Sequence, residues 1–556
     1  RTVPVESGWD VIVTGGGAGG IGAAVSVARA GWKTLLVEAD AFTGGTAAGG
    51  LVAPMSGMFF HGKRVVGGIA WELVQRMERL GAAQVELPKG HVSFHPEYLK
   101  LVSREMLRES GAEVRTGCMA VDCRCDGERL THLIVQTKQG AAALEGRIFI
   151  DATGDGQVCA MAGVPMQAQE RPMQPLSLCF LLEGVDVTTP LLRDSIHHDG
   201  KNGAPSVQQE LHAYLEECVA AGKLDTFGGP WFNTLVRGQT LAVNVTRAAA
   251  NDASPEAMAK AEEALRRDMF TIVELLRARY PEFHSCQIVA SGVRAGVRES
   301  RRICGMETVT GEDLLTGKMP ACPVAHCAHP MDMHSPQSGG QTLVSLKQDA
   351  YVPHGALIPC NRGNLLTAGR CVSADQSAYA SIRVQGTCMC LGQAAGVMAA
   401  QALRTRRDLR ELPAETLREQ VQALTAERDR LAEEAERLRP LEAETAQLKK
   451  ELETLRPDAE AHAMLRDQVG TIECEARRRA AELEEQSTER MRRGVDLFRG
   501  QYQVLMDTFE TAATHMTVEL RKMEVSLAQL PRMMDQTGAE LNTLASTLEK
   551  ARPNQE

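Results

Sequence analysis

Two short apolar segments near the start of the chain flank a helical stretch. Val11–Val13 runs into glycines and other small residues, and Thr34–Val37 leads directly into the acidic Glu38. Short apolar runs bounded by glycine are typical of buried strands. The pattern therefore predicts a strand, a glycine turn, a helix and a second strand over residues 10–38.

Similar patterns return much later in the chain. Residues 147–155 predict a strand that ends in a turn of small residues, and residues 364–402 predict a strand, a turn and a helix beginning near Thr387. Residues 114–137, with Gly127 and Gly140 as turn residues, predict a small antiparallel layer. Strands from distant parts of the chain are thus expected in one fold.

A long amphipathic helix lies in a region without such strand–turn patterns. Between Pro255 and Arg279 apolar residues recur on one face, among them Leu265, Met269 and Leu276. Proline suits the first turn of a helix, and Pro281 ends this one. We expect the helix to belong to a separate, inserted domain.

The composition changes at about Thr405, after which Ala, Glu, Leu, Arg, Gln and Thr dominate. Leucines then recur at every seventh position, a coiled-coil pattern: Leu417, Leu424, Leu431 and Leu438. Pro440 and Pro457 interrupt the helix, and a third helical run is predicted over residues 459–530. A single apolar stripe needs a covering helix, so we expect a second copy, another partner or a later segment of this chain to supply it.

The first turn has the spacing of a dinucleotide-binding motif. Gly15, Gly17 and Gly20 form G-x-G-x-x-G between a predicted strand and helix, and Glu38 ends the next strand. In this motif the first glycine permits the tight turn, the second admits a pyrophosphate, and the third allows close helix–strand packing. The acid at the position of Glu38 hydrogen-bonds a ribose hydroxyl.

The segment after Glu38 favours FAD over NAD. Residues 39–52 are rich in glycine, at positions 44, 45, 49 and 50, where an NAD-binding domain would continue with another helix and strand. Glycine lets the backbone lie close to a large cofactor. A fold that returns to one cofactor from three distant segments fits FAD better than NAD.

These motifs carry a family resemblance. The segments concerned are GGGAGGIGAA, EADAFTGGTAAGGLV, FHPEYLKLVSREML, IFIDATGDGQVCAMAGVP, MQPLSLCFLLEGVD, GVRESRRICG and AGRCVSADQSAYASIRVQGTCMCLGQAAGV. The chain resembles FAD-dependent oxidoreductases of the glutathione-reductase-like superfamily, in the branch near the flavin subunit of heterodisulfide reductase, over roughly residues 9–404. The resemblance implies a flavoprotein with a substrate-capping domain. Heterodisulfide reductases also carry cysteine-rich iron–sulfur segments, and this chain departs from them there.

The predicted fold class is α/β, a Rossmann-like FAD-binding domain with an inserted α+β cap domain, followed by an all-α coiled-coil tail. The expected boundaries are 9–170 for the first part of the FAD-binding domain, 171–350 for the cap, 351–404 for its second part and 405–556 for the tail. The residues expected at the cofactor are Gly15, Gly17, Gly19, Gly20, Glu38, Gly44, Gly45, Thr46, Asp155, Gly369, Arg370, Asp375, Thr387, Cys388 and Met389.

Composition narrows the class further. The formal net charge of −10 argues against nucleic acid, which requires a basic surface. The 15 cysteines show no disulfide-framework spacing, which indicates a reducing compartment and a cytoplasmic protein. No stretch is apolar over the ~20 residues that a membrane span requires. The chain begins with Arg1 and not with Met, so a missing start or removed leader stays open.

Metal ligation is disfavoured. Iron–sulfur C-x₂-C-x₂-C spacing is absent, and Cys123 and Cys125 on one strand face would need further ligands. Residues 322–334 are dense in cysteine and histidine, but the spacing fits no common zinc site and two prolines interrupt any regular scaffold. Asp332 and His334 match an Asp-x-His pattern of the resembling family. We therefore expect a loop wall near substrate or flavin, and no metal.

The candidate residues for acid, base or substrate clamp are His95, Arg298, Arg301, His334, His354 and Arg383. Arg298 and Arg301 are three residues apart and are expected to share a helical face or turn, where they would clamp a carboxylate. Ordinary ion pairing is the competing interpretation for each residue. The helix near Thr387 should direct its positive end at the flavin, where Cys388 would either have a lowered pKa or simply pack.

Three functions fit the sequence. The first is an FAD-dependent oxidoreductase that exchanges hydride or electrons between bound flavin and a small organic substrate. The second is a flavin subunit that passes electrons to an iron–sulfur partner. The third is a coiled-coil scaffold with a flavin-binding head, against which the intact glycine turn and three cofactor segments argue.

Overall fold

The computed structural model describes residues 2–86, 91–189, 191–192, 207–236, 240–250, 252–336, 340–413, 415, 444–445, 447–451, 453–456 and 471–526. The chain divides into two compact units, Arg1–Arg418 and Glu419–Glu556. We describe each unit by itself.

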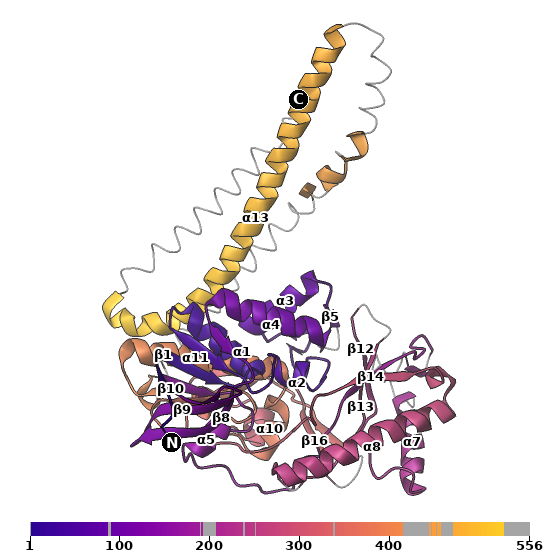
Figure 1. Ribbon diagram of the computed structural model, residues 1–556, viewed down its shortest axis with the longest axis vertical. Coiled ribbons are helices and arrows are strands. Elements are labelled where there is room, and N and C mark those ends of the chain that lie inside the picture. The colour runs from indigo at the N-terminus through magenta and orange to yellow at the C-terminus, as the bar shows by residue number, and fades with distance from the viewer. Residues whose placement is uncertain are drawn as a thin grey trace. The chain divides into compact units, whose positions relative to one another are not determined.

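A sheet with parallel strands forms the centre of the first unit (Figure 1). Strand β1 (Val5–Thr14) lies between β2 (Thr34–Val37) and β10 (Gly140–Asp151), β7 (Glu113–Arg115) pairs with β2, and β19 (Leu365–Thr367) pairs with β10, all in parallel. The carboxyl ends of parallel strands meet at one edge. The three segments predicted to converge on one cofactor therefore do end at the same edge.

The first part of β10 belongs to an antiparallel layer. It pairs with β9 (Arg129–Thr137), which pairs with β8 (Met119–Asp126). Gly127 and Gly140 occupy the turns with positive φ, a conformation that glycine adopts without strain. The antiparallel layer expected from residues 114–137 is confirmed for residues 119–137, whereas residues 114 and 115 belong to the parallel strand β7.

Two helices pack backbone to backbone on the parallel part of the sheet. α1 (Ala18–Arg29) follows the first glycine turn, and α11 (Gln385–Thr405) comes from the far end of the unit. A Cβ on Gly392 would lie 1.9 Å from the carbonyl oxygen of Gly19, and one on Gly22 would lie 2.3 Å from that of Met389. Because only hydrogen fits at these positions, the two helices approach more closely than side chains would allow.

A second sheet forms the cap. It consists of four antiparallel strands in the order β12-β13-β11-β14: Trp231–Thr234, Leu241–Asn244, Phe180–Glu183 and Gln287–Ser291. Its core includes residues of α7 (Val207–Ala220) and α8 (Pro255–Arg279), which lie beside it in Figure 1. The predicted long helix is confirmed with the same bounds, and its predicted apolar face, including Leu265, Met269 and Leu276, is buried.

Residues beyond the cap sheet return to the main body. Val309, Cys327 and Val352 are buried in the same core as α1 and α11. The segment expected to be irregular because of its prolines instead forms β15 (Pro323–Cys327) and β16 (Met331–His334). That expectation was wrong because Pro323 begins one strand and Pro330 precedes the other, positions where proline is tolerated.

The remaining elements of the first unit are short or peripheral. They are α2 (Gly45–Ala48), β3 (Phe59–Phe60), β4 (Lys63–Arg64), α3 (Gly68–Arg79), β5 (Ala83–Glu86), β6 (His91–Phe94), α4 (Pro96–Ser110), α5 (Gln157–Met161), η1 (Pro281–Phe283), α9 (Gly311–Thr316), β17 (Gln341–Val344), β18 (Ala350–Pro353), η2 (His354–Leu357), α10 (Gln376–Ile382) and η3 (Leu409–Glu411).

The main body continues past Thr405, where the composition changes. Leu409 and Leu412 are buried in its core, and the Leu409 amide donates to the Gly363 carbonyl oxygen at 2.9 Å. The change in composition at Thr405 therefore does not mark the end of the main body, because the next few residues still pack in its core.

The second unit contains one long described helix, α13 (Thr471–Ser526). Its basic residues include Arg478 and Arg493, which pair with Glu482 and Glu489 one turn away, as expected for a solvated helix face. The four leucines from 417 to 438, Pro440 and Pro457 lie outside the described residues, so the coiled coil stays a prediction. No helix among the described residues is long and apolar enough to cross a membrane.

The glycine contact between α1 and α11 predicts a large effect of one methyl group. Gly392→Ala should lower the free energy of unfolding by about 3 kcal/mol, because the Cβ would overlap the Gly19 carbonyl. Urea unfolding followed by tryptophan fluorescence measures it, since all four tryptophans lie before residue 418.

Gly500→Ala on α13 is the matched control, because its Cβ would meet no atom within 4 Å. Equal loss of stability in both variants, or none in Gly392→Ala, would contradict the close-packing argument.

Candidate functional site

The first glycine turn lies at the carboxyl end of β1. Gly15 has φ +98°, and a Cβ there would lie 2.5 Å from the Ala152 carbonyl oxygen. A Cβ on Gly20 would lie 1.7 Å from the Gly15 carbonyl oxygen, whereas one on Gly17 would meet only Gly45 Cα, at 3.8 Å. The tight turn and the close helix packing therefore agree with the roles predicted for Gly15 and Gly20. Gly17 borders open space, as a pyrophosphate path requires.

Glu38 stands next to this turn, at the end of β2. Its carboxylate accepts hydrogen bonds from the amides of Gly16 and, at 2.7 Å, Asp40. Burial raises the pKa of Glu38, and the two backbone hydrogen bonds oppose the rise. The backbone thus holds the carboxylate at the place where dinucleotide-binding folds bind a ribose.

The second glycine segment packs directly on the first turn. The Gly44 amide donates to the Gly16 carbonyl oxygen at 2.8 Å, and a Cβ on Gly45 would lie 2.8 Å from Gly17 Cα. The carbonyl oxygen of Thr46 accepts from the Gly50 amide at 3.1 Å. The two segments pack together and form one cradle of backbone, which is buried or half-buried.

The third segment follows β19. Gly369 has φ +90° and faces open space, and a Cβ on Gly19 would lie 3.1 Å from its amide nitrogen. Arg370 pairs with Asp155 at 2.9 Å, and this pairing with the Ser300 hydrogen bond lowers the pKa of Asp155 although burial opposes it. The cofactor contacts predicted for Asp155 and Arg370 stay predictions.

Asp375 has a structural use. One carboxylate oxygen caps α10 through the amides of Ser377 and Ala378, and the other accepts from the Gly311 amide at 2.9 Å. The side chain therefore joins the beginnings of α9 and α10. Its predicted role at the cofactor is not tested by these contacts.

The N-terminus of α11 completes the cradle. A small apolar pocket between α1 and α11 is lined by Ala18, Gly44, Gln385, Gly386 and Met389, among others. The Gln385 Oε1 and Thr387 Oγ1 atoms are buried and have no hydrogen-bond partner among the described residues. Unpartnered polar atoms beside a backbone cradle fit an FAD, whose polar groups would pair with them.

The thiol of Cys388 lies at the same helix end. Burial raises its pKa to about 12, and Sγ lies 3.6 Å from the Ile382 carbonyl oxygen. A lowered pKa is therefore wrong for Cys388, because removal from water outweighs the helix dipole. Packing, the alternative, is what the structure supports.

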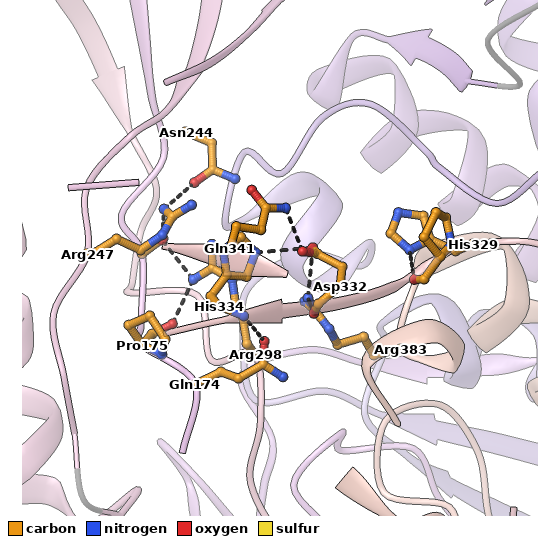
Figure 2. Close-up of polar contacts among 12 residues, drawn as sticks. Gln174, Pro175, Asn244, Arg247, Arg298, His329, Asp332, His334, Gln341 and Arg383 are labelled. Carbon is orange, nitrogen blue, oxygen red and sulfur yellow. Dashed lines mark hydrogen bonds and ion pairs between the residues drawn. The ribbon is translucent and has the colours of Figure 1, made fainter. Parts of the chain in front are cut away.

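A buried polar cluster lies where the cap meets the main body (Figure 2). Arg247 follows β13, Arg298 follows β14, Asp332 and His334 lie on β16, and Arg383 ends α10. We call these five residues the arginine cluster. Arg383 is separated from the start of α11 by a single residue, so the arginine cluster adjoins the cofactor cradle.

Two guanidinium groups of the arginine cluster share one hydroxyl. Arg247 Nη1 and Arg298 Nη1 donate to Ser177 Oγ at 2.6 and 2.8 Å. Arg247 also donates to Asn244 Oδ1 at 2.8 Å, and Arg298 to the Pro175 carbonyl oxygen at 2.7 Å. Both guanidinium groups are thus held by neutral acceptors.

Asp332 is the carboxylate of the arginine cluster. Its Oδ2 lies 3.1 Å from both His334 Nε2 and Arg383 Nη2, and its Oδ1 accepts from Gln341 at 2.6 Å. The His334 amide donates to Gln174 Oε1 at 3.1 Å. Asp332 therefore orients both the imidazole and the Arg383 guanidinium.

Burial sets the charges of these groups. It lowers the pKa of Arg298 well below its usual range and that of Arg247 to about 10, and the neighbouring arginines add to both effects. Burial and the charge of Arg298 lower the pKa of His334 to about 3. The contacts with His334 and Arg383 outweigh burial and hold the pKa of Asp332 far below its usual range. At neutral pH the imidazole is therefore neutral and donates to a charged carboxylate.

The structure brings together three of the six predicted acid, base or clamp residues: Arg298, His334 and Arg383. Arg301 is exposed, and the backbone from 297 to 302 is neither helix nor turn, so the shared helical face or turn expected for Arg298 and Arg301 was wrong. The other two, His354 and His95, make separate contacts: His354 Nδ1 lies 3.4 Å from Glu307 Oε2, and His95 caps α4 by accepting from the Glu97 amide.

Arg247 was missed by sequence reasoning. It follows the apolar strand residues Leu241–Val243 by only a few positions, and an arginine so close to a buried strand was the available signal. No group of three or more cysteine, histidine or acidic side chains that could hold a metal occurs among the residues described.

Comparison with known protein families covers the residues of both sites. The family model described as FAD dependent oxidoreductase matches residues 10–421, which include the cradle and the arginine cluster. No curated protein matches the chain.

Several solved structures are similar at low sequence identity. A geranylgeranyl bacteriochlorophyll reductase-like protein from Thermoplasma acidophilum is 12% identical, with 76% of this chain and 80% of that chain covered and a TM-score of 0.38. The myxobacterial chondrochloren halogenase CndH is 15% identical over 72% and 75%, with a TM-score of 0.36. A p-nitrophenol 4-monooxygenase from Pseudomonas putida is 11% identical over 72% and 79%, with a TM-score of 0.35.

The cradle predicts a separation between folding and cofactor binding. Gly17→Val should fold but purify without FAD, because its side chain would enter the pyrophosphate path while the nearest atom to its Cβ is 3.8 Å away. Flavin absorbance per protein and circular dichroism measure the two properties. Gly20→Val is the contrast and should fail to fold, since its Cβ would overlap the Gly15 carbonyl. A yellow Gly17→Val protein would refute the assigned path.

The depressed pKa of His334 predicts acid sensitivity. An unfolded histidine titrates near 6.5, so from about pH 7 to pH 5 protonation favours the unfolded chain by about 2 kcal/mol. The stabilisation is fully present above the unfolded pKa and is lost as the pH falls toward the folded value of about 3. His334→Gln should lack this part of the pH dependence in urea unfolding, and an unchanged slope would show that His334 is not held neutral.

Proposed function

The chain belongs to the family of FAD dependent oxidoreductases, and we propose that it transfers hydride between bound FAD and a small organic substrate held at the arginine cluster. The proposal rests on one observation: a contact from β16 reaches Arg383, which lies just before α11. Asp332 contacts Arg383, and two residues later α11 begins at Gln385. The side chains of Gln385 and Thr387 carry the unpartnered polar atoms. A substrate at the cluster would therefore lie beside the cofactor.

The cradle residues would hold the cofactor from three sides. Glu38 would bind the ribose of the adenosine half, the amides of the Gly15–Gly20 turn the pyrophosphate, and the start of α11 the flavin end. When bound, FAD supplies the two-electron chemistry of its ring, and the protein supplies position, charge and exclusion of water. The positive end of α11 favours a negative charge at the adjoining part of the cofactor.

His334 is the residue of the cluster suited to move a proton. Its Nε2 is directed at Asp332, which fixes the ring and would stabilise the imidazolium once the ring takes up a proton. Burial, with the charges of Arg298 and Arg247, lowers the pKa of the ring and keeps it neutral before substrate arrives. A neutral, oriented imidazole accepts a proton from a substrate that is being oxidised, and in the reverse direction it returns that proton.

Rapid mixing under anaerobic conditions tests this function. Oxidised holoenzyme is mixed with small organic donors, and chemically reduced holoenzyme with small organic acceptors, while the flavin absorbance is followed. One organic class should change the flavin within a turnover. His334→Gln should slow that step by about 10²-fold or more, the usual contribution of general acid–base catalysis. His132→Gln, on β9 of the antiparallel layer, is the matched control.

Electron transfer to an iron–sulfur partner, as the resemblance to the heterodisulfide reductase branch would suggest, is the competing outcome. A flavin that reacts with a reduced iron–sulfur protein and with no organic compound would replace the proposal by that alternative. If His334→Gln reacted at the unchanged rate, the proposed reaction would stand, but His334 would have no part in the proton transfer.

A further inference from the structure

We propose that the arginine cluster binds the carboxylate group of a small organic acid, with Arg247 and Arg383 as its direct donors. The inference rests on the proposed function in one respect, because it takes this acid to be the substrate. It adds the chemical class of the substrate and a binding residue, Arg247.

The charges of the cluster are unbalanced. Among the described residues, Arg298 is surrounded by Arg247, Arg383, Asp332 and the thiol of Cys179. Burial raises the pKa of Cys179, so the thiol is neutral, and His334 is neutral as well. Three guanidinium groups therefore face a single carboxylate. Buried charges are normally paired, and this excess calls for an anion.

Several other arginines of the chain whose side chains are largely buried pair with carboxylates. Arg29 and Arg76 both contact Glu72, at 2.7 and 2.6 Å, and Arg370 contacts Asp155 at 2.9 Å. Arg247 differs, because it donates to the side chains of Ser177 and Asn244 and to a backbone carbonyl oxygen. Arg302, which is also 2% exposed, is likewise held by neutral acceptors, the carbonyl oxygens of Ala374 and Ala168 among them. What distinguishes the arginine cluster is that three guanidinium groups gather at one carboxylate.

Unused donors remain in the cluster. Arg247 is 2% exposed, yet its Nη2 has no hydrogen-bond partner among the described residues, and neither has Arg383 Nε. Buried donors are rarely left without an acceptor, because each such donor costs the free energy of its lost hydration. Arg247 Nη2 and Arg383 Nε each offer one charge-assisted N–H donor, which suits a carboxylate oxygen.

The position of the cluster favours a carboxylate on the reacting molecule itself. Arg383 lies two residues before the start of α11, and the cap residue Val293 donates its amide to the Gly49 carbonyl oxygen of the cradle at 2.8 Å. The cap and the cradle thus meet around the site, and the anchored group and the reacting carbon must be close together in the substrate. A small carboxylic acid meets this requirement.

Binding to the oxidised FAD-loaded protein tests the inference without turnover. Butyrate, its neutral analogue butyramide, succinate and inorganic phosphate are compared by equilibrium dialysis and by the shift in melting temperature. Butyrate and succinate should bind and raise the melting temperature, and butyramide should bind about 10- to 100-fold more weakly, as expected for the loss of charge-assisted hydrogen bonds.

Variants separate a binding role from a structural one. Arg247→Gln and Arg383→Gln should each weaken butyrate binding about 10- to 100-fold. Arg267→Gln is the matched control, because this exposed arginine of α8 pairs with Glu263 away from the cluster. Without ligand, Arg247→Gln should keep its FAD and its melting temperature, since it removes one of three like charges. A merely structural Arg247 would instead lower the melting temperature.

Each result decides one point. Equal binding of butyrate and butyramide, or an equal loss in Arg267→Gln, would overturn the inference. Binding of phosphate but of neither carboxylate would replace it by a phosphate site. Carboxylate binding without any flavin reaction would leave this site standing and refute the proposed function. A flavin reaction with a neutral compound, without carboxylate binding, would support the proposed function and refute the carboxylate site.

Discussion

The direct backbone contact between α1 and α11 is the constraint on which the site depends. Gly22 and Gly392 allow it, because a Cβ at either position would overlap a carbonyl oxygen of the facing helix. The contact joins two helices more than 350 residues apart in the chain. It thereby brings the beginnings of both helices to the edge where the parallel strands end. The two helix N-termini and three glycine segments that we propose hold the cofactor are brought together by this contact.

The position of the arginine cluster follows from the same constraint. Arg383 directly follows α10 and α11 begins at Gln385, so the placement of α11 also places the guanidinium group that contacts Asp332. Arg247 and Arg298 come from the cap, after β13 and β14. The cap therefore contributes positive charge, and the main body contributes the strand that carries Asp332 and His334. Their charges interact strongly because all of these groups are removed from water.

Two of the histidine–carboxylate pairs in the first unit have different surroundings. His334 has buried arginines beside it, and they lower its pKa together with burial. His354 faces Glu307, which opposes the effect of burial on its pKa. The charged groups beside each imidazole thus decide how far its pKa departs from the usual value.

Local patterns in the sequence determined the elements that the backbone makes on its own. The glycine spacing from Gly15 to Gly20, the acid at 38, the two parallel-strand segments around 150 and 366, and the helix Pro255–Arg279 follow from steric and hydrophobic periodicity, which act over a few residues. Only the tertiary structure decided which charged side chains meet. Arg298 and Arg301 are neighbours in sequence but not in environment, whereas Arg247, Arg298 and Arg383 come from three separate elements. Proline at the strand beginnings of β15 and β16, and the burial that raises the pKa of Cys388, likewise depend on strand pairing and packing with distant segments. No local pattern records such contacts.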